Sequence, residues 1–240
     1  MKVKILETEF DNLTMDEAVE EAWRLMAERR GAYVVTPNPE MSMVCREDAE
    51  ALEAVNGADL VIADGVGIIY GAKIMKTPLK EKIPGIDLTA RIFERMAAEG
   101  KSCYLFGARP GVAEKAGENL AEKYPGLVIA GCHDGYFADD SNIVRRINEA
   151  APDLLLVCLG MPKQEKWMRS RKGDLNVGLM IGAGGSLDVF AGVVERAPES
   201  WQKLGLEWLY RLKKEPWRLG RMMRLPKYLF AVIKQKISTK

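Results

Sequence analysis

Polar, glycine-rich turns follow several apolar runs of this sequence, and their side chains could bind an anion or move a proton. Asp64 follows the run Leu60-Val61-Ile62-Ala63 and precedes Gly65. Such a run is typical of a strand buried on both faces, and Asp-Gly ends it because glycine tolerates the positive φ of a sharp turn. We therefore predict Asp64 at the carboxyl end of a strand, where open α/β sheets bind ligands. The alternative is that Asp64 only caps the next helix.

Other apolar runs end in turns of the same kind. These turns are Thr36-Pro37-Asn38-Pro39, Gly107 to Gly111, His133-Asp134-Gly135-Tyr136, Gly160-Met161-Pro162-Lys163-Gln164 and Gly182-Ala183-Gly184-Gly185. If the strands are parallel, all the turns lie at one edge, where helix N-termini offer N–H groups to an anion such as a diphosphate. This edge predicts a nucleotide pocket, although a tight connection explains any single turn more simply.

The elements that must position these turns alternate along the chain. Apolar runs predict strands at 32–36, 60–63, 102–106, 127–130, 154–159 and 178–181. Helical periodicity and caps predict helices at 14–31, 40–55, 68–75, 87–99, 112–123, 141–149 and 163–171. This alternation indicates an α/β fold: a Rossmann-like, mostly parallel sheet of about six strands with helices on both faces.

A shift in composition near Arg196 divides the chain of 240 residues. We predict an α/β catalytic domain at 1–196 and a basic, amphipathic helical appendage at 197–240. From Trp201 onward there are 11 Lys or Arg and 2 Glu, so this segment carries +9 and the remainder −8. Such asymmetry indicates that the segment meets something anionic.

Spacing within the appendage predicts one charged helical face. The cations Arg211, Lys214, Arg218 and Arg221 follow helical spacing, and Trp201, Trp208 and Trp217 are of the type found at membrane interfaces. We expect this appendage to meet a membrane. The alternative is a solvated basic helix packed on its own domain.

Several classes of protein lack support in the sequence. No Walker lysine, full dinucleotide fingerprint or G-x-S-x-G elbow is found, which argues against ATPases, dehydrogenases and α/β-hydrolases. The four cysteines form no C-x-x-C pair and are expected to be reduced core residues of a cytosolic protein. No run approaches the ~20 apolar residues that cross a bilayer. The only histidine, His133, is interpreted as structural.

Five segments in order give the sequence a specific resemblance. They are Thr36-Pro37-Asn38-Pro39-Glu40, Ala63-Asp64-Gly65-Val66-Gly67, Pro84-Gly85-Ile86-Asp87-Leu88, Cys158 to Glu165, and the block from Gly182-Ala183-Gly184 to Arg196-Ala197-Pro198. Together they resemble the WecG/TagA/CpsF glycosyltransferase family over nearly the whole chain. The resemblance implies transfer of N-acetylmannosamine, or its uronic acid, from UDP to the C4 hydroxyl of N-acetylglucosamine on undecaprenyl diphosphate. Glucose is another possible donor sugar. Such transfer serves wall teichoic acid or a related surface polysaccharide.

The resemblance also assigns roles to positions of this chain. Asp64 is the expected general base. The other positions are expected at Thr36, Asn38 and Gln164 for the donor sugar, Tyr136 and Asp188 for the nucleotide end, Lys82 for phosphate, and Arg218, Arg221 and Arg224 for the acceptor diphosphate. Gly107 and Gly160, in the glycine-rich turns at strand ends, are further substrate-binding candidates. Lys82 stands where an arginine is expected in many relatives, and lysine lacks the bidentate geometry of arginine.

The expected chemistry agrees with these residue types. An inverting transfer needs one base for the acceptor hydroxyl, and an aspartate with a reference pKa of about 3.9 is ionised at pH 7. Charge on the departing UDP needs helix N-termini, a cation or a metal. No Asp-x-Asp dyad is evident, and the adjacent Asp139-Asp140 is expected to be solvated or capping. We expect no cofactor and no metal.

We expect the protein to be cytoplasmic and to bind peripherally to the inner face of the cytoplasmic membrane. Homo-oligomers are possible, and no nucleic-acid motif is recognised. A rival function from another class is a non-catalytic protein that binds sugar nucleotides.

Overall fold

The computed structural model describes residues 1–214, 216 and 219–238. Its main sheet has six strands in the order β4-β3-β8-β7-β5-β6, all parallel. The strands are β3 (Ala32–Val35), β4 (Leu60–Val61), β5 (Ser102–Gly107), β6 (Val128–His133), β7 (Leu154–Cys158) and β8 (Leu179–Gly182). The six predicted strands and the α/β class are therefore confirmed. An antiparallel hairpin of β1 (Lys2–Ile5) and β2 (Thr8–Asp11), which was not predicted, precedes them.

The helices follow the predicted order, with a few changed boundaries. The first eight are α1 (Met15–Glu28), α2 (Pro39–Glu47), α3 (Ala49–Asn56), α4 (Val66–Met75), α5 (Gly85–Ala98), α6 (Val112–Lys123), α7 (Ser141–Ala150) and α8 (Lys163–Arg171). The last five are α9 (Ser186–Phe190), α10 (Glu199–Lys203), α11 (Glu207–Lys214), α12 (Leu219–Met222) and α13 (Arg224–Ser238).

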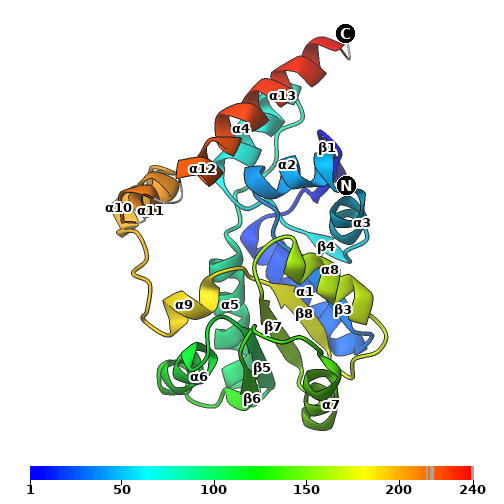
Figure 1. Ribbon diagram of the computed structural model, residues 1–240, viewed down its shortest axis with the longest axis vertical. Helices are drawn as coiled ribbons and strands as arrows, with labels where there is room; N and C mark the ends of the chain where they lie inside the picture. Colours follow the sequence, from blue (N-terminus) through cyan, green and yellow to red (C-terminus); the bar gives the residue numbers. More distant parts are fainter. Residues whose placement is uncertain (215, 217–218, 239–240) are drawn as a thin grey trace.

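Two apolar cores cover the two faces of the sheet (Figure 1). Successive strand residues point to opposite faces, so Tyr104 and Phe106 of β5 enter one core while Cys103 and Leu105 enter the other. Helices α1, α5 and α6 supply the second core, and α2, α3, α7 and α8 supply the first. Because both faces are covered, ligands can reach the sheet only at its edges or ends.

Two predictions about helices are wrong, each for a local reason. The expected helix at 40–55 is two helices, since Asp48 ends α2 and its carboxylate accepts a hydrogen bond from the Ala51 N–H at the start of α3. The basic stretch is divided between α11 and α12, with Pro216 between them. Proline removes a backbone donor and clashes with the preceding turn, so the cation spacing does not describe one helix.

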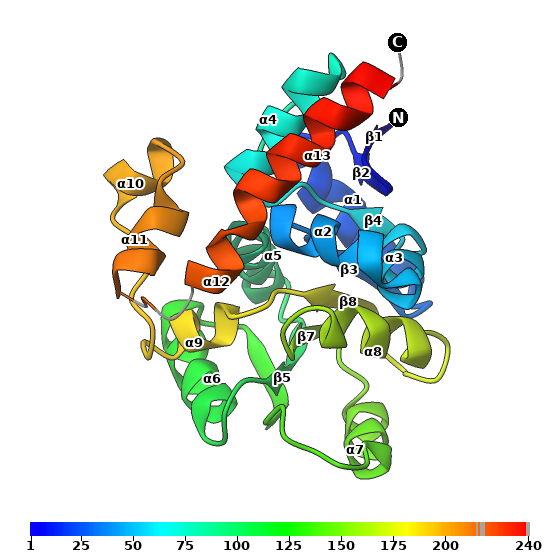
Figure 2. The ribbon, with the colours of Figure 1, turned by 45° about the horizontal axis from the view of Figure 1, so that its top comes forward.

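Helix α13 packs against α4 and α2, far from it in sequence (Figure 2). Tyr228 and Val232 are fully buried in the same core as residues of α2 and α4. The Gln235 side chain accepts a hydrogen bond from the Leu6 N–H, which ties α13 to the amino-terminal hairpin. The division at 196/197 stays a prediction, but this last helix shares the core of the α/β part.

The contact between α4 and α13 depends on a glycine. A Cβ at Gly71 would lie 2.3 Å from the Tyr228 Oη and 3.1 Å from its Cζ. Gly71 therefore lets the tyrosine ring approach the backbone of α4. None of the described helices is long and apolar enough to cross a bilayer.

We expect Gly71→Ala to lower the free energy of unfolding by about 1 to 2 kcal/mol, because overpacking outweighs the helix propensity gained. Chemical denaturation measures this change. The Tyr228 hydroxyl has no hydrogen-bond partner within the described structure, so Tyr228→Phe should relieve most of the penalty in the double variant.

Gly117→Ala in α6 is the matched control, since its new Cβ would lie 3.3 Å from the nearest side-chain atom. This control should cost little or nothing. If Gly71→Ala lowers the free energy of unfolding equally with and without Tyr228→Phe, the Tyr228 hydroxyl is not the cause of the destabilisation.

Candidate active site

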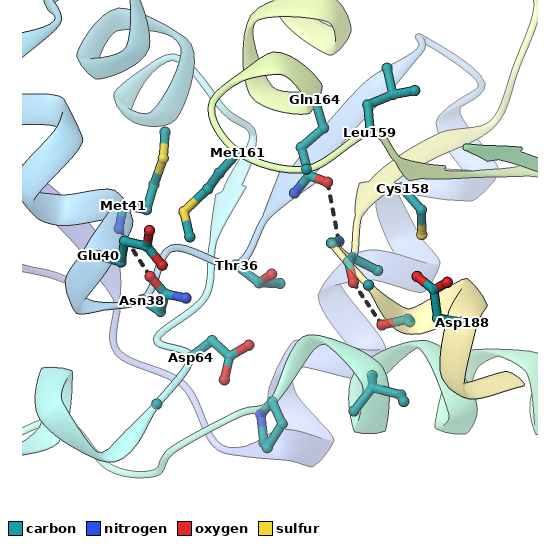
Figure 3. Close-up of a pocket in the computed structure, with 18 of the residues that line it drawn as sticks. Thr36, Asn38, Glu40, Met41, Asp64, Cys158, Leu159, Met161, Gln164 and Asp188 are labelled. Carbon is teal, nitrogen blue, oxygen red and sulfur yellow. Dashed lines mark hydrogen bonds between the residues drawn. The ribbon is translucent and has the colours of Figure 1, made fainter. Parts of the chain in front are cut away.

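A cavity of about 850 Å³ opens at the carboxyl ends of the parallel strands. It is lined by most of the predicted site residues, namely Thr36, Asn38, Asp64, Lys82, Tyr136, Gly160, Gln164 and Asp188. Figure 3 shows Thr36, Asn38 and Asp64 grouped together, with Asp188 on α9 farther along the same pocket. The sheet therefore collects at one edge side chains that are up to 152 residues apart in sequence.

Asp64 lies just beyond β4, and both its backbone and its side chain are held by hydrogen bonds. Its N–H donates to the Pro37 carbonyl at 3.3 Å, and its Oδ2 accepts from the Gly85 N–H at 3.4 Å, at the start of α5. The N-cap of α4 is Gly65, with φ 91° and no side-chain cap. The capping alternative for Asp64 is therefore wrong, and the half-buried carboxylate faces the cavity.

Thr36 and Asn38 are held beside Asp64 by the turn after β3. The Thr36 hydroxyl donates to the Gly182 carbonyl at 3.1 Å, which joins the ends of β3 and β8. Asn38 is the N-cap of α2, and its Oδ1 accepts from the Met41 N–H at 2.9 Å with Pro39 in the first turn. Since the cap uses the oxygen, the Asn38 amide nitrogen remains as a donor toward the cavity.

Gln164 is clamped in place by two hydrogen bonds. Its Oε1 accepts from the Gly184 N–H at 3.1 Å, and its Nε2 donates to the Glu165 Oε1 at 2.9 Å. Glu165 is only 2% exposed, and its Oε2 has no hydrogen-bond partner within the described structure. Burial raises the pKa of Glu165 to about 7, partly offset by the hydrogen bond from Gln164.

The residues predicted to bind the nucleotide have an aromatic ring or a backbone segment that a ligand can contact. Tyr136 is 68% exposed, and its N–H donates to Asp134 Oδ1 at 2.8 Å, which fixes the turn. At Gly160 and Gly184, both at positive φ, a Cβ would meet nothing within 4 Å. A ligand can therefore approach the backbone closely at these two turns.

Comparison with known proteins decides the family. A profile of the Glycosyl transferase WecG/TagA/CpsF family matches residues 3–240. The chain belongs to the WecG/TagA/CpsF family. It is a glycosyltransferase, as the motifs predicted. Proteins named "N-acetylglucosaminyldiphosphoundecaprenol N-acetyl-beta-D-mannosaminyltransferase" from Staphylococcus aureus strains MW2, NCTC 8325 / PS 47 and COL are 35% identical over 237 residues. Each match covers 98% of this chain and 93% of the relative.

Some predicted positions of this WecG/TagA/CpsF protein lie elsewhere. Gly107 does not line the cavity; a Cβ there would lie 2.3 Å from the Cys158 carbonyl oxygen, so this glycine allows β5 and β7 to approach. Arg224 is 3.5 Å from Glu40 and lines a second cavity of about 620 Å³ that shares Glu40 and Gly160 with the first. Arg218 and the Arg221 side chain lie outside the described residues.

The structure also places the tryptophans and the aspartate pair. Trp208 lines the main cavity and Trp201 packs edge-on against Tyr210, and their role at a membrane interface stays a prediction. Trp217 lies outside the described residues. Asp139 is exposed, and Asp140 is the N-cap residue of α7, as expected. The Asp140 carboxylate itself is 8% exposed and accepts hydrogen bonds from Trp167 and Arg171. His133 does not line the cavity, and its ring contacts the edge of Phe106.

Four charged residues in or near the site are among those to which sequence reasoning gave no role. Glu40 and Glu165 line the cavity, and Arg196, outside this lining, forms two hydrogen bonds to Asp87 at 2.6 and 2.7 Å. All four belong to the motifs that carried the resemblance, but a motif does not say which of its charged residues pair with one another. Helical spacing carries no such information either, because the pairs are distant in sequence.

We expect Glu165→Gln to change how stability depends on pH. Because the folded-state pKa is raised from 4.5 to about 7, the folded protein holds a proton that the unfolded chain has released, and stability is lost as pH rises between these values. As pH rises from 4.5 to 8, the original protein loses this stability and the variant does not. The unfolding free energy of the variant minus that of the original protein should therefore increase by about 1 to 3 kcal/mol over this range.

Denaturant unfolding at several pH values measures this gain. Glu122→Gln, at an exposed position of α6, is the control and should leave the pH dependence unchanged. Parallel curves for Glu165→Gln and the original protein would mean that Glu165 is ionised in the folded state.

Proposed function

We propose that this glycosyltransferase moves N-acetylmannosamine from UDP-N-acetylmannosamine to the C4 hydroxyl of N-acetylglucosamine on undecaprenyl diphosphate, with inversion, in wall teichoic acid or related polysaccharide synthesis. The names of the Staphylococcus aureus relatives support this acceptor and this sugar. The observation that carries the proposal is the position of Asp64, whose carboxylate lines the cavity beside Thr36 and Asn38.

Inversion in a single displacement assigns Asp64 one task. A β product formed from an α-linked nucleotide sugar requires the acceptor oxygen to attack the anomeric carbon opposite the departing UDP. A base must take the hydroxyl proton during this attack. Asp64 is a carboxylate anchored by the backbone of two elements, so it can accept the proton without losing its position.

The departing UDP gains negative charge, which this cavity can stabilise. Among the residues that the structure describes, the cations Lys82, Arg109 and Lys163 line it. The Lys163 Nζ donates to the Gly135 carbonyl at 3.1 Å and lies 4.1 Å from the centre of the Phe137 ring, so it is held near the nucleotide turns. A diphosphate placed against Gly160 and these cations would have its charge balanced as the bond breaks. That no metal is needed stays a prediction.

The exposed Tyr136 ring and the Asp188 carboxylate suit the nucleoside end of the donor. Stacking on an aromatic ring accommodates a base, and a carboxylate can accept hydrogen bonds from ribose hydroxyls. Thr36 and Asn38 lie beside Asp64 (Figure 3) and Gln164 lines the same cavity, which supports their assignment to the sugar. Which epimer or uronic acid is bound depends on these few contacts.

Membrane association is part of the proposal, since the acceptor is a lipid. Helix α13 exposes Phe230, Ile233 and Ile237 at 71%, 45% and 69%. These residues follow helical spacing opposite the buried Tyr228 and Val232, and Lys227 and Lys234 flank them. Apolar side chains together with lysines on one helix face suit the interface of an anionic bilayer. The acceptor's lipid tail would then remain in the membrane.

We expect Asp64→Asn to lower kcat by about 10² to 10⁴-fold, since the amide cannot take the proton, with donor affinity nearly unchanged. The assay follows UDP release and disaccharide formation from UDP-N-acetylmannosamine and a short-chain lipid-linked acceptor. Calorimetry with UDP-sugars gives donor affinity and tests other donors.

Asp188→Asn, in the same cavity, is the control and should raise KM for the donor more than it lowers kcat. A fully active Asp64→Asn variant would refute the base assignment. UDP release without disaccharide from the original protein would indicate donor hydrolysis and count against transfer. Donor binding with neither product formed would favour a protein that only binds sugar nucleotides.

We expect the triple change Phe230→Ser, Ile233→Ser and Ile237→Ser to weaken binding to anionic vesicles by about tenfold or more, because three apolar side chains lose burial in lipid. The thermal midpoint should stay close to the original, since the replaced side chains are exposed. Vesicle sedimentation measures the partition.

Val128→Ser is the matched control, at a site that is 49% exposed on β6, and should not change binding. Unchanged partition of the triple variant would mean that this face of α13 does not contact lipid.

A further inference from the structure

Arg196 lies among carboxylates at the start of α5. It forms a bidentate ion pair with Asp87, with N–O distances of 2.6 and 2.7 Å. Its Nε is 4.0 Å from a carboxylate oxygen of Glu207 on α11 and has no hydrogen-bond partner within the described structure. The Arg196 side chain is 25% exposed, and its two partners connect the start of α5 with α11.

Asp64 belongs to the same charge cluster. Burial lowers the pKa of the Arg196 guanidinium, but its hydrogen bonds to Asp87 outweigh this effect and the pKa is raised. The charges of Glu207 and Asp64 add to the rise. This coupling is mutual: a carboxylate that favours the charged guanidinium is itself favoured in its ionised form.

Two effects act on Asp64 in opposite directions at this place: the amino end of α5 favours its ionised form, and the nearby charge of Asp87 opposes it. Asp64 and Asp87 both lie at the amino end of α5, where Asp64 Oδ2 accepts from the Gly85 N–H. Like charges that share a site raise each other's pKa, and a protonated Asp64 could not accept the acceptor's proton. The other described charged residues that line the cavity are Glu40, Lys82, Arg109, Lys163, Glu165, Asp188 and Glu207.

We infer that Arg196 is a positioning residue for the proposed base: paired with Asp87 and held against Glu207, it keeps the Asp64 carboxylate ionised at the pH of the reaction. This inference rests on the proposed function. It gives Asp87 the opposite electrostatic effect, because its negative charge opposes ionisation of Asp64 while its hydrogen bonds fix Arg196.

The test compares the pH dependence of kcat for the original enzyme with that of Arg196→Gln, Arg196→Lys and Asp87→Asn. The acidic limb of the profile reports the base in the substrate complex. We expect Arg196→Gln to move this limb to higher pH by about one unit, which lowers kcat about tenfold at pH values below both midpoints. Arg196→Lys keeps the charge and should leave the limb nearly in place, whereas Asp87→Asn should move it to lower pH.

If the Arg196–Asp87 pair had only a structural role, the loss of either partner would have the same effect on the acidic limb. Arg171→Gln, which breaks the comparable pair with Asp140 outside the cavity, is the matched control and should not move the limb. The inference would be overturned if the acidic limbs of Arg196→Gln and Asp87→Asn coincide with that of the original enzyme. It would also be overturned if both limbs move in the same direction. If Arg196→Gln fails to fold, the opposite displacement in Asp87→Asn remains decisive.

A second measurement does not depend on turnover. In protein labelled with ¹³C at aspartate carboxyl groups, the Asp64 signal is assigned by its loss in Asp64→Asn. Its titration midpoint should rise in Arg196→Gln and fall in Asp87→Asn. An unmoved midpoint overturns the role of Arg196, whereas shifted midpoints in a protein that forms no disaccharide would contradict only the proposed function.

Discussion

The structure depends on one constraint: a parallel sheet whose two faces are both covered by apolar helices. Parallel neighbours need a crossover after each strand, so the chain leaves every strand at the same edge. The turns after β3, β4, β7 and β8 meet there, and these turns bring Thr36, Asp64, Gly160 and Gly184 to one cavity. Several polar residues of this edge also hold the local structure, since Asn38 caps α2 and the Thr36 hydroxyl joins β3 to β8.

The carboxyl-terminal segment supplies part of the cavity wall and packs against helices of the α/β part. Trp208 and Glu207 from α11 form part of the cavity wall, while α13 is docked on α2 and α4 through Tyr228. Helix α2 starts at Asn38, a residue of the cavity, so α13 packs against an element that positions the site. In the proposed function, the helix face that would meet lipid and the site that would receive the lipid-linked sugar are therefore parts of one packed unit.

Two carboxyl groups of the cavity illustrate how surroundings separate roles. Glu165 is buried, accepts a hydrogen bond from Gln164 and has its pKa raised to about 7, so it orients a neighbour at the cost of stability at higher pH. Asp64 is half-buried, accepts a hydrogen bond from the first residue of α5 and interacts electrostatically with Arg196. Residue type alone does not distinguish them, because both are carboxylates within family motifs. Burial and charge partners do.

The sequence alone determined the six parallel strands, most helix boundaries, the family, and the place of Asp64 at a strand end, because apolar periodicity and glycine turns act over a few residues. It did not determine the break at Asp48, the separation of α11 from α12, or the packing role of Gly107. Only the tertiary structure decided that Arg196 pairs with Asp87, that Trp208 turns inward, and that the exposed face of α13 is apolar as well as basic. These outcomes depend on contacts between segments far apart in the chain, and local patterns in the sequence do not specify which segments will meet.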